Sequence, residues 1–206
     1  MPTNTFLNLE SEKKTRILKA VIDEFSEKQY EQVQISDIIK HAKIPRGSFY
    51  QYFVDKEDLY LYLIDIIRNE KMLFLMNTLG NSQGMNFLDL VRKLYDDGVK
   101  FALRFPQYVK ILDHLLKNKS KIYEKLMSDN IKIAEDIYAD LIDKDKAKGL
   151  IKEDIDTRTF SRIIVQLTAN IAVEELDMNH QDESYQKMLE RNNQVLKIIE
   201  RGVLKG

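Results

Sequence analysis

Apolar residues recur at helical spacing along almost the whole chain, and this pattern constrains the fold more than any other feature of the sequence. Ile17, Val21 and Phe25 stand four positions apart, so they fall on one face of a helix. Comparable runs continue to residue 203. The 206 residues include only seven glycines and three prolines, whereas sandwiches and barrels use such residues at every turn. The sequence therefore predicts an all-α fold.

About nine helices are predicted from these runs and from the residues that interrupt them. Pro45 ends one run, because the residue before a proline is driven out of the helical region. Asp55 and Asp58 resemble a capping box at the start of a long helix, and residues 80–84 form the most loop-like stretch of the chain. The predicted helices span residues 12–28, 35–42, 46–53, 56–79, 87–105, 108–116, 122–148, 159–178 and 183–203.

Composition and charge exclude several classes of protein. The chain has no cysteine, which excludes disulfide frameworks and thiolate metal sites. Its first residues are too polar for a signal peptide, and no apolar stretch is long enough to span a bilayer. Thirty-two basic residues against 33 acidic ones leave a net charge of −1, so a nucleic-acid partner must be met by a local basic patch. We expect a cytoplasmic protein with no membrane partner.

The polar residues do not form a recognisable catalytic motif. His41, His114 and His180 are far apart in the sequence, and neither an HExxH motif nor a phosphate-binding glycine loop occurs. The acidic pairs at 96–97 and 174–175 are typical of solvated helix faces. We therefore predict a protein that is not an enzyme, with no catalytic residues, no metal site and no cofactor.

A short basic segment accompanies the helix break at Pro45. Lys40, Lys43 and Arg46 lie within residues 39–53, where no acidic residue occurs. The short helices on either side of the break have the layout of a helix-turn-helix, whose second helix enters the major groove of DNA. That second helix also carries hydroxyl and amide side chains suited to phosphates and base edges. This segment predicts binding to double-stranded DNA.

The same part of the sequence resembles the TetR (tetracycline-repressor) family of bacterial transcriptional regulators. The resemblance rests on Arg16-Ile17-Leu18, Phe25, Tyr30, Asp37-Ile38, Ala42, Ile44 and the run GSFYQYFVDKEDLY at 47–60. Beyond this run the chain matches the family in layout only. The resemblance implies a helix-turn-helix domain at residues 1–55 and a helical ligand-binding and dimerisation domain at 56–206.

The resemblance also implies roles for individual residues. Those near base edges are Arg46, Gly47, Ser48 and Gln51, and those on phosphates are Gln34, Tyr50, Tyr52 and Lys56. The alternative for the two tyrosines is packing in the core of the small domain, which does not prevent a hydroxyl from reaching a phosphate. The alternative for the two charged side chains is solvated surface.

Three positions depart from the family's pattern. Gln29 and Lys43 stand where glycines are usual, so a left-handed turn residue there would be a non-glycine at modest strain. Gln34 stands where a threonine or serine usually caps the helix, and glutamine is a poor N-cap. A weakened turn is therefore one possible outcome.

The resemblance further implies a homodimer formed by the last two helices. Their broad apolar stripes would meet those of a second copy in a four-helix bundle. The interface residues implied are Phe160, Ile164, Leu167, Met188, Val195 and Ile199. The alternative is that these residues pack inside one chain.

The middle helices are rich in apolar and aromatic residues and suggest a pocket for a small lipophilic or aromatic effector. Its expected lining is Tyr95, Phe101, Tyr123, Met127, Gln166, Asn170, Ile171 and Glu174, with the polar members orienting the ligand. The alternative is again that the lining residues are core. The resulting prediction is a homodimeric, ligand-responsive repressor of a pseudo-palindromic operator, released by this inducer. The alternative is a helical small-molecule or lipid-binding protein with a degenerate DNA-binding domain.

Overall fold

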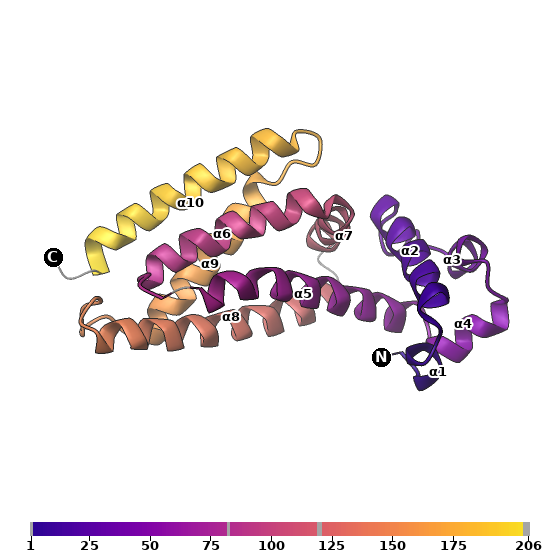
Figure 1. The fold of residues 1–206 in the computed structure, drawn as a ribbon. Coiled ribbons are helices and arrows are strands. Elements are labelled where there is room, and N and C mark those ends of the chain that lie inside the picture. The colour runs from indigo at the N-terminus through magenta and orange to yellow at the C-terminus, as the bar shows by residue number, and fades with distance from the viewer. Residues whose placement is uncertain (1, 82, 119–120, 204–206) are drawn as a thin grey trace. The chain divides into compact units, whose positions relative to one another are not determined.

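The computed structural model describes residues 2–81, 83–118 and 121–203, except the side chains of residues 121–123, 125, 127 and 129. Within these ranges the chain forms ten helices and no strand (Figure 1). In chain order they are α1 (Asn4–Leu7), α2 (Ser11–Glu27), α3 (Ile35–Ala42), α4 (Arg46–Tyr52), α5 (Lys56–Gly80), α6 (Phe87–Arg104), α7 (Pro106–Lys117), α8 (Lys121–Ala147), α9 (Thr157–Glu175) and α10 (Gln181–Val203). The all-α prediction is confirmed.

Helices α2 to α10 correspond to the nine predicted helices, with ends that differ by a few residues. The additional helix, α1, has only four residues, too few for a periodic apolar pattern to be visible. It begins at Thr3, whose hydroxyl accepts a hydrogen bond from the backbone N–H of Phe6. The apolar pattern therefore did not predict that the segment before α2 is structured.

The start of α5 shows the predicted reciprocal capping. The carboxylate of Asp55 accepts a hydrogen bond from the backbone N–H of Asp58 at 2.8 Å. The carboxylate of Asp58 reaches back to the backbone N–H of Val54 at 3.1 Å, one residue earlier than in a standard capping box. Two of the N–H groups around the first turn of α5 are thereby satisfied.

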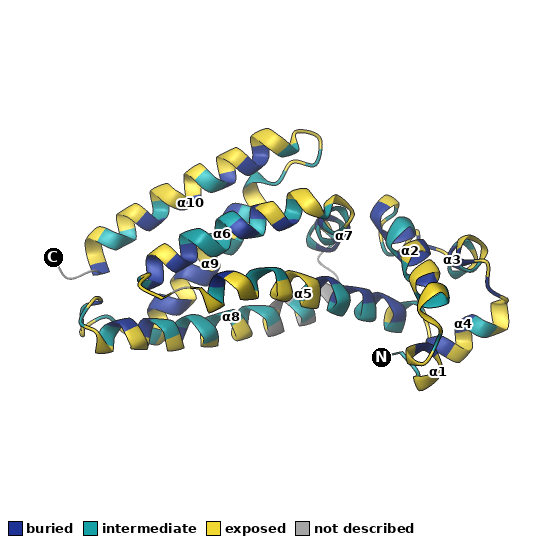
Figure 2. Cartoon of the chain, in the orientation of Figure 1, coloured by how far each residue is buried: buried dark blue, intermediate teal, exposed yellow. Residues whose placement is uncertain are grey.

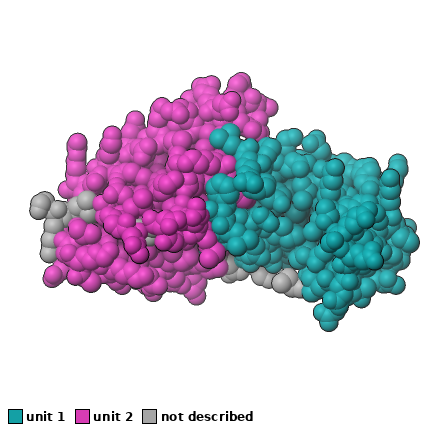
Figure 3. Space-filling view, viewed as in Figure 1, with its two compact units in different colours: residues 1–74, 102–118 teal, residues 75–101, 119–206 magenta. Residues whose placement is uncertain are grey.

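The chain divides into two compact units (Figure 3). Unit 1 comprises Met1–Phe74 and Ala102–Asn118, and unit 2 comprises Leu75–Phe101 and Lys119–Gly206. Helices α5 and α6 each contribute residues to both units. The predicted domain division at residues 55 and 56 stays a prediction, because spatial compactness does not report which segment folds on its own.

The core of unit 1 is aromatic. Phe6, Phe25, Phe49 and Phe53 are each at most 2% exposed. The rings of Phe6 and Phe53 lie 4.8 Å apart between centroids, and the ring of Tyr62 on α5 contacts both. Offset and tilted ring pairs of this kind contribute about 0.5–1.5 kcal/mol each beyond the area that they bury. This core fixes the short helices α1 and α4 against α5.

The core of unit 2 is built from α6, α8, α9 and α10, whose dark-blue buried positions are visible in Figure 2. The buried members of this cluster are Phe87, Leu88, Val91, Ile142, Ile151, Phe160, Ile164, Leu196 and Val203. The ring of Phe160 meets that of Phe87 edge-on at 5.7 Å. Two residues expected at a dimer interface, Phe160 and Ile164, therefore pack inside the single chain.

Candidate nucleic-acid interface

The outer face of α4 carries the side chains predicted to read bases. Arg46, Gly47 and Gln51 are exposed and Ser48 is half-buried, while Phe49 on the opposite face is 2% exposed and anchors the helix in the core. Tyr50 is 53% exposed, so its hydroxyl is available to a partner. A two-turn helix held by one buried aromatic thus presents polar and basic groups to solvent.

Gly47 has no structural reason within the described chain to be a glycine. A Cβ atom added there would meet nothing within 4 Å, and its backbone is not in the left-handed region. A glycine in a helix usually lowers stability by about 0.5–1 kcal/mol relative to alanine. The missing side chain therefore leaves open space on the face of α4 that would approach DNA.

The turn between α3 and α4 adopts the left-handed geometry that the sequence left in doubt. Lys43 has φ 51° and ψ 49°. Its N–H donates to the carbonyl of Lys40 and the N–H of Ile44 donates to that of Ile39, each at 3.2 Å, which is the paired bonding of a Schellman cap. The non-glycine strain expected at Lys43 is confirmed, whereas Gln29 does not have a positive φ.

Helix α1 holds the C-terminal end of α4. The hydroxyl of Thr3 donates to the carbonyl of Gln51 at 2.6 Å, and its backbone N–H donates to the carbonyl of Tyr52 at 2.9 Å. These bonds satisfy two carbonyls that the end of a helix leaves without partners. Phe6 packs against the ring of Tyr52, which is only 3% exposed. Tyr52 is thus a core residue in this conformation, and its predicted phosphate contact stays a prediction.

Lys56, also predicted on a phosphate, is engaged inside unit 1. Its ammonium donates to the backbone carbonyls of Tyr30, Glu31 and Val33 at 2.8, 3.4 and 3.1 Å. It also lies 4.6 Å from the centre of the Tyr30 ring. Lys56 therefore fixes the loop between α2 and α3, and a phosphate would have to compete with three carbonyl groups for its ammonium.

A buried carboxylate ties α2 to the first helix of the pair. Glu24 is 6% exposed, and its oxygens lie 2.8 Å from both the ammonium of Lys28 and Nδ1 of His41. Lys28 also reaches Asp37 at 3.0 Å. The hydrogen bonds that the Lys28 ammonium donates to Glu24 and Asp37 raise the pKa of Lys28 above its ordinary value. His41, the one histidine of the basic segment, is held by this contact.

Gln34 occupies the N-cap position of α3, as predicted. Its backbone is extended, and its side chain makes no capping hydrogen bond. The amide is exposed and stays a candidate phosphate donor. At the other end of α3, the guanidinium of Arg16 donates to the carbonyl of Ala42 at 3.0 Å. An arginine on α2 therefore completes the end of α3 next to the turn.

Sequence reasoning missed several residues that position this surface. Thr3 and Phe6 lay before the first predicted helix, and Glu24 looked like one more charged residue on a helix. The signal that was available for Glu24 is its place among Ile17, Val21 and Phe25, four residues apart on the buried face. A carboxylate near that face requires a cationic partner.

The described residues predicted for an effector pocket differ in burial. Phe101 and Ile171 are each 3% exposed and Tyr95 is half-buried. Gln166, Asn170 and Glu174 are exposed, contrary to the inward orientation expected of them. The side chains of two further members, Tyr123 and Met127, lie outside the described residues.

The residues predicted for a dimer interface also differ in how far they are buried. Met188 is buried at 8% exposure, while Val195 and Ile199 are half-buried. Of the six, Leu167 is the exposed one, at 36%. Exposed apolar side chains accompany it on α9 and α10, namely Ile163, Val173 and Ile198.

The described part of the chain shows neither a candidate metal site nor a membrane span. It contains no group of three or more histidine or acidic side chains placed to hold a metal ion. None of its helices combines the length and the apolar character of a membrane span.

A short helix with exposed polar and basic groups, set after a left-handed turn and fixed in an aromatic core, is the arrangement of a helix-turn-helix DNA-binding protein. Comparisons with known proteins agree. Residues 17–63 match the sequence model described as "Bacterial regulatory proteins, tetR family". A stretch of 49 residues is 41% identical to the transcriptional regulator AcuR of Cereibacter sphaeroides and covers 24% of this chain and 22% of AcuR.

Two longer matches extend past the helix-turn-helix. The HTH-type transcriptional regulator YvdT of Bacillus subtilis is 27% identical over 176 residues, which cover 79% of this chain and 81% of YvdT. The crystal structure of a TetR family transcriptional regulator from Chloroflexus aurantiacus covers all of both chains at a TM-score of 0.67 and 28% identity. Residues 17–63 therefore carry the helix-turn-helix segment of the TetR family of bacterial transcriptional regulators, and the whole chain is similar to regulators of that family, which is not a family of enzymes.

Proposed function

We propose that this protein is a homodimeric, ligand-responsive repressor that binds a pseudo-palindromic operator in the bacterial cytoplasm. The observation that carries the proposal is the outer face of α4. Arg46 and Gln51 are exposed there beside the open backbone of Gly47. Arginine and glutamine are the side chains that make paired hydrogen bonds to guanine and adenine in the major groove.

Selection of operator sequences from random DNA, followed by mobility shift at several salt concentrations, tests this function. Affinity should fall with the logarithm of salt concentration by ~0.9 per phosphate neutralised. Arg46→Ala should cost ~1–3 kcal/mol per half-site and relax the preference at one symmetric pair of positions. The matched control is Arg104→Ala, an exposed arginine at the end of α6, which should leave the selected sequence unchanged.

A selection that yields no enriched sequence would refute sequence-specific DNA binding. If Arg46→Ala selects the same sequence as the wild type, Arg46 contacts phosphates and not base edges, and the DNA-binding function stands. A uniform loss over all sequences is expected instead for variants of residues that touch only the backbone of DNA, such as Tyr50→Phe.

The homodimer is supported by apolar side chains that the single chain leaves uncovered. Ile163 and Leu167 on α9 are 43% and 36% exposed, and Ile198 on α10 is 73% exposed. The first two lie four residues apart and therefore on one face of α9. Recognition helices read half-sites about one DNA turn apart, which requires two copies.

The inducer is proposed to be a small lipophilic or aromatic compound. Support comes from the apolar interior of unit 2, which includes Phe101 and Ile171. A thermal-shift screen of fatty acyl and aromatic compounds, followed by operator release, tests it. An inducer must bind the DNA-incompetent state more tightly, since equal affinity for both states shifts nothing. Stabilising compounds that leave operator affinity untouched would refute the inducer class.

The alternative of a carrier with a degenerate DNA-binding domain has less support. It was suggested by the missing glycines at Gln29 and Lys43. The Schellman cap at Lys43 keeps the geometry of the turn without a glycine, which favours a working helix-turn-helix.

A further inference from the structure

Unit 2 contains a surface cavity of about 350 Å³ between α6 and α10. Its lining residues are Met85, Asp89, Arg92, Lys93, Asp96, Leu189, Asn192 and Asn193. None of them belongs to the pocket predicted from the sequence. The volume lies at the lower end of the range of roughly 300–1,000 Å³ that is usual for ligand sites. The cavity is therefore large enough for a small molecule.

One residue of the cavity lining, Asn192, carries a buried acceptor without a hydrogen-bond partner. Asn192 is 2% exposed, and its Oδ1 has no partner. Buried polar atoms are nearly always paired, so this oxygen has hydrogen-bonding capacity that the described chain does not use. The other unpartnered buried side-chain atoms of the described chain are the hydroxyls of Tyr95 on α6 and Tyr185 on α10. All three thus belong to the two helices that enclose the cavity.

The charged side chains that line the cavity are equal in number of each sign. Some of their hydrogen-bonding groups are not used within the chain. Arg92 donates to Asp89 and to Glu200 at 2.8 and 2.6 Å, which engages two of its five N–H groups. Lys93 donates to Asp97 at 2.8 Å. Asp89 and Asp96 supply carboxylate oxygens on the same wall. Two cations and two carboxylates leave the lining neutral.

A neutral lining of this kind selects against a ligand with a net charge, because such a ligand would leave one charge without compensation. A molecule with one carboxylate and one ammonium can pair with both signs. The side chains of Met85 and Leu189 give an apolar surface for a short hydrocarbon part. We propose that the cavity between α6 and α10 binds a small zwitterionic molecule of the amino-acid type as an effector.

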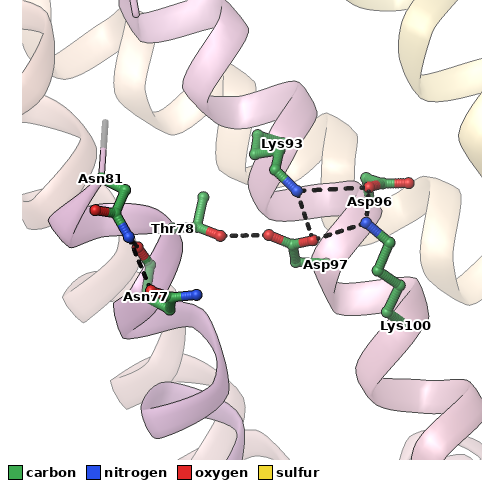
Figure 4. Close-up of polar contacts among 7 residues, drawn as sticks. All are labelled: Asn77, Thr78, Asn81, Lys93, Asp96, Asp97 and Lys100. Carbon is green, nitrogen blue, oxygen red and sulfur yellow. Dashed lines mark hydrogen bonds and ion pairs between the residues drawn. The ribbon is translucent and has the colours of Figure 1, made fainter. Parts of the chain in front are cut away.

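A polar network connects this cavity to α5. Figure 4 shows the carboxylate of Asp97 between the hydroxyl of Thr78 on α5 and the ammonium groups of Lys93 and Lys100 on α6. Asp97 is 7% exposed, which corrects the expectation that the pair at 96–97 is a solvated face. Lys100 also reaches Asp96 at 2.5 Å. Lys93 is thus shared between the cavity and the carboxylate that holds the end of α5.

A ligand carboxylate that draws Lys93 toward the cavity weakens the hold of α6 on Thr78. Because α5 begins directly after α4, a change at its far end is a route by which the ligand alters operator affinity. This regulatory step rests on the proposed DNA-binding function, whereas the binding site does not. The cavity also lies away from the exposed apolar face of α10. Asn193 and Leu189 precede Ile198 by five and nine positions, close to the opposite side of the helix at 100° per residue.

Binding is tested on the full chain without DNA, by calorimetric titration with each of the standard amino acids. The decarboxylated amines and deaminated acids of the same compounds form the comparison arms. We expect at least one amino acid to bind, and its amine and acid counterparts to bind at least tenfold more weakly. Binding of the amines or acids alone, or of no compound, would overturn the proposal.

Variants then locate the site. Asn192→Leu removes the orphaned acceptor and fills its space, and should abolish binding. Leu189→Glu, at a half-exposed position, adds a third carboxylate and should also abolish it without demanding a change in the core. Gln194→Leu is the matched control, since Gln194 is exposed on α10 and does not line the cavity. Equal binding by wild type and both cavity variants would place the ligand elsewhere.

The route to α5 is tested with Thr78→Val, which keeps the shape of the side chain but removes its bond to Asp97. In the wild type the amino acid should weaken operator affinity by a factor within the usual range for coupled sites, roughly 5- to 150-fold. In Thr78→Val the amino acid should bind as before and leave operator affinity unchanged. Retained coupling in this variant would refute the route. Binding of the amino acid by a protein that selects no operator would refute the proposed function alone.

Discussion

Two single residues, Lys43 and Gly47, affect the position and the exposed surface of α4 through their backbone properties. Lys43 accepts a left-handed conformation that costs a non-glycine residue roughly 1–2 kcal/mol. Gly47 makes α4 less stable than an alanine at the same position would. The resemblance to the TetR family predicted a left-handed non-glycine residue at Lys43, because a glycine is usual at this position. It could not predict that the space around Gly47 is empty, because this depends on the packing of α4.

Replacing Gly47 by alanine should separate stability from DNA binding. The added methyl group meets nothing within 4 Å, so the variant should be more stable by about 0.5–1 kcal/mol in denaturant unfolding. If the backbone of α4 approaches DNA closely, operator affinity should nevertheless fall about tenfold or more, in the range of one lost contact. Unchanged operator affinity in the stabilised variant would show that Gly47 does not face DNA.

Asp97 gives unit 2 a dependence on pH. Burial alone would raise the pKa of this carboxyl, but hydrogen bonds from Lys93, Thr78 and Lys100 hold it at about 2, below its ordinary 3.8. The ionised form is therefore favoured by folding. Ionised Asp97 adds about 2 kcal/mol to the free energy of unfolding. This stabilisation is complete above pH ~4 and is lost as the pH falls toward 2.

Comparing Asp97→Asn with the wild type in urea unfolding at several pH values tests this contribution. The variant should be less stable near pH 6, and the difference should shrink as the pH falls below 4. Asp154→Asn, at an exposed position, is the control and should show little difference at any pH. If Asp97→Asn is less stable than the wild type by the same free energy at every pH, the ionisation of Asp97 is not coupled to folding.

At the scale of helices, the short ones depend on their neighbours. An isolated helix of seven residues such as α4 is not stable in water, so its shape is imposed by tertiary contacts. Those contacts come from the aromatic core and from α1, whose Thr3 caps the last carbonyls of α4. The order and approximate bounds of the nine longer or better delimited helices followed from apolar periodicity and from Pro45 and Pro106. The role of α1 did not, since four residues carry no period.

Phe6→Ala tests the contribution of α1. The side chain is fully buried among three aromatic rings, so its loss should cost about 3–5 kcal/mol in denaturant unfolding. Operator affinity should fall as well, because the end of α4 loses its support. Leu7→Ala is the matched control, since Leu7 is 45% exposed on the same helix. Normal operator affinity in a destabilised but folded Phe6→Ala protein would show that α4 keeps its position without α1.

For the whole molecule, the sequence indicated the resemblance to the TetR family and a candidate DNA-reading face, but not which apolar residues are left exposed for a partner. Periodicity shows that one face of a helix is apolar. It does not show whether that face packs against its own chain or against a second copy. Ile164 was assigned to the dimer and is fully buried in the core of unit 2. Ile198, one residue before the predicted Ile199, is the more exposed of the two. A helix turns by about 100° per residue, so that single step changes the face.

Ile198→Glu should therefore dissociate the proposed dimer while leaving each chain folded. The side chain is 73% exposed in the single chain, so the substitution should change monomer stability by no more than about 0.5 kcal/mol. Inside an apolar interface the same carboxylate is unpaired and costs several kcal/mol. Sedimentation velocity measures the outcome, with Asn193→Glu as the control on the opposite flank of α10. Equal dimer fractions in both variants would place the interface elsewhere.

The attachment of Thr3 to the end of α4 has a practical consequence for anyone who purifies this protein. A segment fused ahead of Pro2 would start within a few residues of the helix proposed to read the operator. A polyhistidine tag there would bring additional imidazoles close to that helix, and protonated imidazoles attract any DNA regardless of sequence. Affinities and salt slopes measured with such a tag in place would describe the fusion, so the tag should be removed before operators are compared.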